Sequence, residues 1–231
     1  MTDISEIVLL TLRVAVTGVL FAAPIAFGLA YLLARGRFVG RSLLSALIML
    51  PLVLPPVVTG LILLDLFGPN GPLGQFFGSF GLEFGFRWTG AALAAGLVAL
   101  PLMVRPMRLV LEGVDPALHE ALAVAGHGRW SRLIRLDLPL ALPGLLAGLI
   151  LGFAKALGEF GATITFVANI PGETQTLSLA IFSALQTADG MEMVYLLSGI
   201  SIAISIIAVV ASEVLVERVS NKLAGRERGH A

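Results

Sequence analysis

The sequence contains no cysteine among its 231 residues. This absence excludes disulfides, iron–sulfur clusters, thiolate metal sites and thiol catalysis. Charge is also scarce, because only 13% of the residues are charged, and the 15 basic and 15 acidic side chains cancel. Such a balance gives no electrostatic reason to expect a nucleic-acid partner. With 57% hydrophobic residues and a mean hydropathy of +0.95, the composition predicts an integral membrane protein that contacts lipid.

Lysine is nearly absent and occurs only as Lys155 and Lys222. Alanine follows the first and leucine the second, so neither fits the Gly-x-x-x-x-Gly-Lys-Ser/Thr loop that cradles phosphates. The three histidines, His119, His127 and His230, lack metal-ligand spacing, and we expect ordinary loop and tail residues. The sequence therefore predicts no bound metal, no cofactor and no ATP hydrolysis in this chain.

Long apolar runs are the main feature that is present, and a membrane span needs about 20 apolar helical residues. Five segments of this kind predict five spans: 12–34, 43–67, 88–111, 140–168 and 192–216. A sixth apolar stretch, 176–186, is too short to cross and predicts a re-entrant or interfacial helix. The expected fold is all-α, with six apolar helices in one transmembrane domain over residues 1–231.

The basic residues gather in three stretches, 35–41, 105–135 and 218–228. The positive-inside rule then predicts that these stretches and the C-terminus are cytoplasmic. The N-terminus and the connections 68–87 and 169–191 are expected outside. Because no basic residue precedes Arg13, the first apolar segment does not look like a cleaved signal, and we expect it to be retained.

Prolines and glycines predict two local features of the spans. Pro51, Pro55 and Pro56 must break or kink the second span, either to shape a gate or as static architecture. The glycines that recur every four residues in the fourth span predict a face for close helix packing. They are Gly144, Gly148 and Gly152.

The cytoplasmic segment 112–139 is longer than a connection between neighbouring helices needs to be. Asp115 followed by proline predicts a helix start, and Gly126 predicts its end. A second short helix is expected from Arg129 to Leu136, ending at Pro139. The segment has two interpretations: an amphipathic helix on the lipid surface, or a knob that docks into a groove of another protein.

Motifs in this segment resemble a known family. Glu120-Ala121-Leu122, three residues, Gly126, nine residues and then Leu136-Asp137-Leu138-Pro139 is similar to the EAA loop of ABC importer permeases. In that family the loop is a coupling helix that sits in a cleft of the ATPase subunit. Leu122 stands where the family usually has alanine, which leaves the helix intact. Segments 50–64, 100–115 and 156–187 resemble the molybdate permease branch, so the similarity covers nearly the whole chain.

The resemblance implies a type I importer permease fold and a set of partners. These are a second copy of the chain in a homodimer, two copies of a cytoplasmic ATPase that carries ATP and Mg, and a periplasmic or extracellular molybdate-binding protein. The implied location is the cytoplasmic (inner) membrane of a prokaryote. ATPase coupling is expected at Glu120, Ala121, Leu122, Gly126, Arg129, Leu138 and Pro139. The alternatives are the same machinery for tungstate or sulfate, an integral membrane enzyme, and a passive channel or scaffold.

A translocation path is predicted along the stretch from Lys155 to Ser178, which begins within the fourth span. Lys155 and Glu159 are four residues apart at hydrocarbon depth. The pair has two interpretations: it is a neutral pair that locks helix packing, or Lys155 supplies positive potential to the path of an oxyanion. Neutral donors to an oxyanion follow them: Thr163, Thr165, Asn169, Gln175, Thr176 and Ser178. Arg87 at the outer rim either attracts anions or the binding protein, or lies at the lipid interface beside Trp88.

Overall fold

The computed structural model describes the backbone of residues 3–228, and the side chains of residues 3–211 and of Val214. Across these residues the regular secondary structure is helical, as the sequence predicts. The basic side chains of the C-terminus and the third histidine lie outside the described residues: Arg218, Lys222, Arg226, Arg228 and His230.

The helices follow one another along the chain in a simple order. In order, they are α1 (Ile4–Arg35), α2 (Arg41–Val53), α3 (Pro56–Phe67), α4 (Pro72–Gly78), α5 (Trp88–Glu112), α6 (Pro116–Val124), α7 (Arg129–Arg132), the π-helix η1 (Leu133–Asp137), α8 (Leu138–Leu157), α9 (Gly161–Val167), α10 (Leu177–Leu185) and α11 (Met191–Arg228). Within the described residues, four helical runs are long and apolar enough to cross a membrane, or five if the bent pair α2 and α3 is one span.

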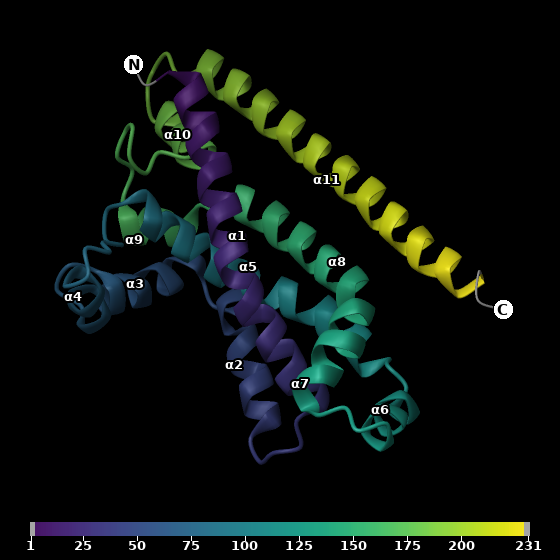
Figure 1. The fold of residues 1–231 in the computed structure, drawn as a ribbon. Helices are drawn as coiled ribbons and strands as arrows, with labels where there is room; N and C mark the ends of the chain where they lie inside the picture. Colours follow the sequence, from purple (N-terminus) through teal and green to yellow (C-terminus); the bar gives the residue numbers. More distant parts are fainter. Residues whose placement is uncertain (1–2, 229–231) are drawn as a thin grey trace.

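The centre of the fold is the contact of α1, α5 and α8, where small residues let helix backbones touch (Figure 1). A Cβ added at Gly18 of α1 would lie 2.4 Å from the carbonyl oxygen of Ala92 in α5. A Cβ at Gly148 of α8 would lie 2.8 Å from the carbonyl oxygen of Met103, also in α5. Gly144 meets the Pro106 carbonyl of α5 in the same way, and Gly152 packs against the Met103 side chain, so the predicted packing role of the three α8 glycines is confirmed.

The second predicted span, 43–67, is a bent pair of helices in the structure. α2 ends at Val53, α3 begins at Pro56, and their axes differ by 109°. Leu54 is extended because the following proline disfavours helical backbone there. Pro56 fills the first turn of α3, where its missing amide is tolerated. The predicted break in this span is confirmed.

The fourth span starts before residue 140, because α7, η1 and α8 form one run from Arg129 to Leu157. The prediction of a separate second cytoplasmic helix ending at Pro139 is therefore wrong. The wide turn of η1, closed by a bond from the Leu138 amide to the Leu133 carbonyl, carries the helix past this proline. Such a π-turn accommodates a residue that has no amide to give.

The same span also ends before residue 168. α8 stops at Leu157, and a short break leads into α9, which packs tightly on α3. A Cβ at Gly60 of α3 would lie 2.6 Å from the carbonyl oxygen of Ala162, and one at Gly161 would lie 2.5 Å from Cβ of Pro56. α3 and α9 are thus joined backbone to backbone.

The short apolar stretch 176–186 forms α10, which at ~1.5 Å per residue is about 14 Å long and too short to cross. Its first amide, at Leu177, donates to the Thr11 hydroxyl of α1 at 2.8 Å. Its apolar side packs with Ile7 of α1 and Leu197 of α11. The expectation of a short helix is confirmed by this length, and its insertion into the membrane stays a prediction.

The two ends of α1 mark two ends of the molecule. Figure 1 shows α10 and the start of α11 beside the N-terminal end of α1, and α6 and α7 near its other end. The connection 169–191 and the segment 112–139 therefore lie at opposite ends, as the predicted topology requires.

Candidate functional site

The first candidate site is α6 with the turn that follows it. Asp115 Oδ1 accepts a hydrogen bond from the Ala117 amide at 2.8 Å, which caps the helix start. Gly126 has a φ of 84°, and the next amide, of His127, bonds back to the Leu122 carbonyl at 2.9 Å. A left-handed glycine with this bond is a standard helix ending. The predicted helix start and glycine stop are both confirmed.

α6 has no buried residue, and apart from the half-buried His119 and Leu122 its residues are exposed. Leu118 is 46% exposed and Val124 is 90% exposed, while Trp130 just beyond the turn is 78% exposed. Large apolar side chains left exposed on a helix indicate a surface that lipid or another molecule covers. The rest of the described chain leaves this surface open.

The predicted coupling residues fall in two places. Glu120, Ala121, Leu122 and Gly126 lie on α6 and its turn, whereas Arg129, Leu138 and Pro139 lie on the run that becomes the fourth span. Leu122 is half-buried and the other six are exposed. The two places are linked through Asp137, which the sequence analysis named within the motif but gave no role.

Asp137 is fully buried at the end of η1. Its Oδ1 accepts a hydrogen bond from Arg35 Nη2 of α1 at 3.1 Å. His119 Nε2 of α6 lies 3.1 Å from the same oxygen, at ion-pair distance but without the angles of a hydrogen bond. Arg132 Nη1 of α7 donates to the His119 carbonyl at 3.3 Å. One carboxylate thus brings α1, α6 and the run of η1 and α8 together.

The sequence holds one signal for this cluster, an acidic residue within a strongly basic stretch. Its main partner, Arg35, is 102 positions away, a separation that no local pattern predicts. His119, which was expected to be an ordinary loop residue, lies on α6 with its Nε2 at 3.1 Å from this carboxylate. His127 contacts the Ser131 hydroxyl at 3.1 Å, and among the described residues no group of three or more ionisable side chains forms a metal site.

The second candidate site begins at Lys155, whose Nζ donates to Glu159 Oε2 at 2.9 Å. Glu159 is 4% exposed, and its other oxygen accepts from the Ala162 amide at 3.0 Å. This carboxylate therefore closes the break between α8 and α9 and caps the start of α9. The lysine side chain is 30% exposed, so it is the accessible member of the pair.

The neutral donors divide by burial. Thr163, Gln175 and Thr176 are buried inside this chain, whereas Thr165, Asn169 and Ser178 are half-buried. The Thr165 hydroxyl donates to the Gly161 carbonyl at 2.9 Å, and the Asn169 amide bonds the Ser183 hydroxyl of α10. In the described chain they line one hairpin, formed by α9, the connection after it and α10.

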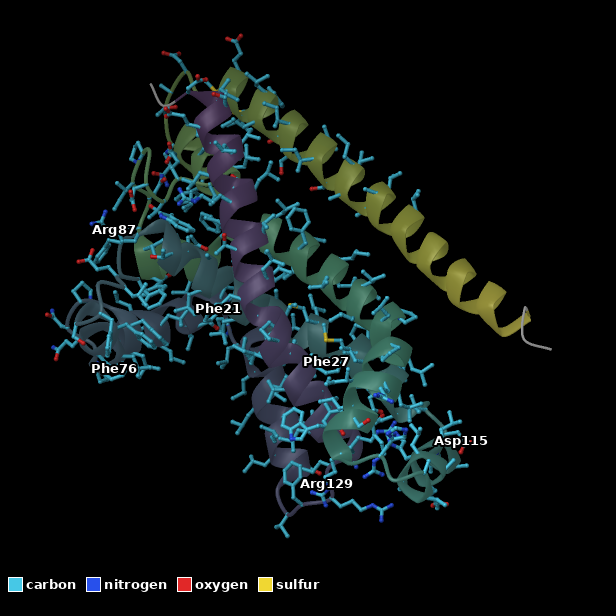
Figure 2. The ribbon with its side chains drawn as sticks, viewed as in Figure 1. Phe21, Phe27, Phe76, Arg87, Asp115 and Arg129 are labelled. Carbon is cyan, nitrogen blue, oxygen red and sulfur yellow. The ribbon has the colours of Figure 1, made fainter. Side chains whose placement is uncertain are left out.

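Arg87 pairs with two carboxylates of its own chain. It lies 3.2 Å from Glu83 and 3.8 Å from Glu173, so it links the connections 68–87 and 169–191. Trp88 makes its cation–π contact with Arg13 rather than with Arg87, and the guanidinium carbon of Arg13 lies 3.7 Å from the ring centroid. Figure 2 shows Arg87 toward the N-terminal end of α1 and Asp115 and Arg129 toward the other end.

A family model described as "Binding-protein-dependent transport system inner membrane component" matches residues 18–221. The molybdenum transport system permease protein ModB of Haemophilus influenzae is 50% identical, over 93% of this chain and 94% of its own length. ModB of Escherichia coli K12 is 48% identical over 96% of each chain. The sulfate transport system permease protein CysT of Escherichia coli K12 is 42% identical over 71% of this chain and 60% of its own length.

The fold has a counterpart among solved structures. The crystal structure of a bacterial ABC transporter involved in the import of the acidic polysaccharide alginate matches with a TM-score of 0.73 and 17% identity, over 92% of this chain and 78% of that one. The family match identifies a non-catalytic membrane subunit of a transporter, with an ATPase and a binding protein as the partners that such a system requires. The chain belongs to the family of binding-protein-dependent transport system inner membrane components.

Proposed function

We propose that this chain is the membrane-spanning subunit through which an ATP-driven importer moves molybdate across the cytoplasmic membrane. The observation that carries the proposal is α6, a capped helix without a buried residue that is joined to the ends of two spans. Its exposed apolar side chains fit a groove on a partner. Helices that lie on a lipid surface are rich in lysine and arginine, and α6 contains neither.

The substrate assignment rests on the relatives. Two proteins named for molybdenum transport share about half of their residues with this chain over nearly all of both chains. The sulfate permease matches over a smaller share of this chain. Tungstate has the same charge as molybdate and nearly the same size, so it remains the alternative substrate within this mechanism.

The proposed assembly contains two copies of this chain, two copies of an ATPase that binds ATP and Mg, and a molybdate-binding protein on the outer side. One copy presents its half-buried donors along a single hairpin, and a second copy would supply the facing wall. α2 and α3 present exposed apolar side chains that the second copy and lipid would cover, among them Val53, Val57 and Leu61. Glu120 and Gly126 belong to the ATPase contact.

The proposed orientation places α6 in the cytoplasm and the N-terminus outside, with α2 and α3 together as one bent crossing and α10 as a re-entrant helix. It is supported by contacts that group the segments by side. Arg87 and Glu173 join two connections that are expected outside, and Arg41 and Glu112 join two that are expected inside, at 2.9 Å.

The proposed path follows the segment from Lys155 to Ser178. Lys155 supplies positive potential that Glu159 moderates, so an oxyanion is attracted without being trapped. Hydroxyl and amide donors then replace part of its hydration. The half-buried members, Thr165, Asn169 and Ser178, can meet an anion in the described conformation. The buried members, Thr163, Gln175 and Thr176, can do so only after the hairpin moves.

The function is tested by purifying the chain from its native cells under conditions that keep partners bound. We expect an ATPase to co-purify, together with a binding protein whose released oxyanion is molybdate by mass spectrometry. Tungstate or sulfate in its place would support the alternative substrates. A chain that binds neither an ATPase nor a binding protein would contradict the proposal and favour a channel or an enzyme.

A further inference from the structure

α6 is held to the membrane domain by few contacts. Because it buries none of its residues, apolar packing on its own chain contributes little to its position. Among the described residues, two polar contacts join it to the spans, and both involve His119. One is the contact of its ring with Asp137, and the other is the bond from Arg132 to its carbonyl.

Asp137 is placed so that a movement of α6 reaches two spans together. It is the last residue of η1 and directly precedes α8, and its partner Arg35 is the last residue of α1. His119 and Arg35 contact the same oxygen, Oδ1. A displacement of His119 therefore changes the environment of an atom that α1 also contacts.

The cluster is incompletely hydrogen-bonded in this conformation. Asp137 Oδ2, Arg35 Nε and Arg132 Nε are buried, and none of them has a hydrogen-bond partner among the described residues. Buried polar atoms without partners are rare and costly, and a second arrangement that satisfies them would be favoured once α6 is moved. Such a cluster can hold two arrangements of the same helices.

We propose that Asp137 is a positioning residue that transmits the movement of α6 to α1 and α8 through His119 and Arg35. The proposal rests on the proposed function, in which an ATPase docks on α6. It adds the route by which that docking reaches the spans. Asp137 is fully buried, so it acts without touching the ATPase.

The test uses the complete complex of this chain with its ATPase, reconstituted in lipid vesicles. The readout is the ratio of ATPase activity with molybdate-loaded binding protein to activity without it, per assembled complex. For Asp137→Asn we expect this ratio to fall by about fivefold or more, the usual size of coupling between linked sites. The amount of ATPase bound to the chain should stay native, which a defect in docking or folding would not allow.

His119→Gln is the second variant, because it leaves the pair of Arg35 and Asp137 intact. It should lower the ratio in the same way, and the double variant should lower it no further, since both changes break one route. Glu112→Gln is the matched control. It removes the negative charge that pairs with Arg41 and Arg108, both at 2.9 Å, near the same end of the spans without touching α6, and its ratio should be native.

The outcomes separate this inference from the proposed function. If the unaltered complex shows no stimulation by the binding protein, the proposed function fails. If it is stimulated and both variants are stimulated equally, the route through Asp137 is refuted. Failure of both variants to assemble would also overturn it, because the cluster would then be a folding element. If only Asp137→Asn fails to assemble, the ratio measured for His119→Gln decides: a lowered ratio supports the route, and a native ratio refutes it.

Discussion

The side chain of Glu159 makes two contacts with different consequences. One oxygen neutralises Lys155, and the other caps the first turn of α9. The cap gives this carboxylate a structural role whether or not substrate passes nearby. Lys155 has no second contact of this kind in the described chain, so its charge is the more direct probe of the path.

Replacing Lys155 with methionine removes the charge and keeps much of the length. If the amine helps an oxyanion to enter, uptake at limiting molybdate should fall. The free-energy barrier to entry should rise by about 1 to 3 kcal/mol, the scale of a charge-assisted hydrogen bond. Lys155→Arg keeps the charge and is the control. Uptake is measured per assembled complex, and a native rate for Lys155→Met would show that the lysine only packs.

Glu159→Gln should affect the fold more than transport. The variant keeps an oxygen for the Ala162 amide but leaves the lysine amine without its counter-charge, which is costly at a poorly hydrated site. Because Lys155 is 30% exposed, the loss of stability should be modest, about 1 kcal/mol. Thermal unfolding of the purified protein measures it. A stability equal to that of the unaltered chain would contradict the assignment of a structural pair.

Helix packing in this molecule depends on glycines whose neighbours differ along one helix. At Gly18 of α1 an added methyl group would meet the Ala92 carbonyl at 2.4 Å, whereas at Gly28 of the same helix it would meet nothing within 4 Å. Gly18→Ala should therefore lower the free energy of unfolding by about 1 to 3 kcal/mol, as overpacking does. Gly28→Ala is the matched control and should be neutral or slightly stabilising. Equal melting temperatures for the two variants would contradict the close contact of α1 and α5.

The turn after α6 offers a similar pair. Gly126 has a φ of 84°, whereas Gly128 has a φ of −66°, and neither has a neighbour within 4 Å of an added Cβ. An alanine at 126 would have to adopt a left-handed backbone at a cost of about 1 to 2 kcal/mol. Gly126→Ala should weaken ATPase binding by about 5- to 30-fold, and Gly128→Ala should not. Binding is measured by titrating the ATPase onto the detergent-solubilised chain, and equal affinities would show that the turn does not position α6.

Local signals in the sequence predict where elements start and stop, because proline and glycine act on their own backbone. The predicted cap forms at Asp115, the predicted helix end forms at Gly126, and the predicted break forms at Pro55 and Pro56. The angle of 109° between α2 and α3 depends instead on packing against α9, through Gly60. The partners of Asp137 are equally inaccessible to a local pattern, since Arg35 reaches it only through the contact of α1 with α8.

The whole molecule has two polar ends. The positions of the basic residues alone predict which end is cytoplasmic and which lies outside. Asn70 and Asp189 are exposed in connections at the predicted outer end, and Gly128 is exposed at the other. Gly74 is less suitable for substitution, because an added Cβ would lie 1.9 Å from the Gly68 carbonyl.

Single cysteines test this orientation cleanly, because the chain has no native cysteine. In intact cells an impermeant maleimide should label Asn70→Cys and Asp189→Cys, and should label Gly128→Cys only after the cells are opened. The expected result follows from the positive-inside rule. Labelling of Gly128→Cys alone in intact cells would invert the proposed topology.

The central claim is that this chain conducts molybdate when a separate ATPase acts on α6. It is tested most directly by vesicles that contain the chain and its ATPase, with ATP and Mg on the ATPase side and the binding protein on the other. We predict that radiolabelled molybdate enters the ATPase side only with ATP and binding protein both present, and that the Gly126→Ala variant reduces this uptake. Uptake that continues without ATP would contradict the account and indicate a passive channel.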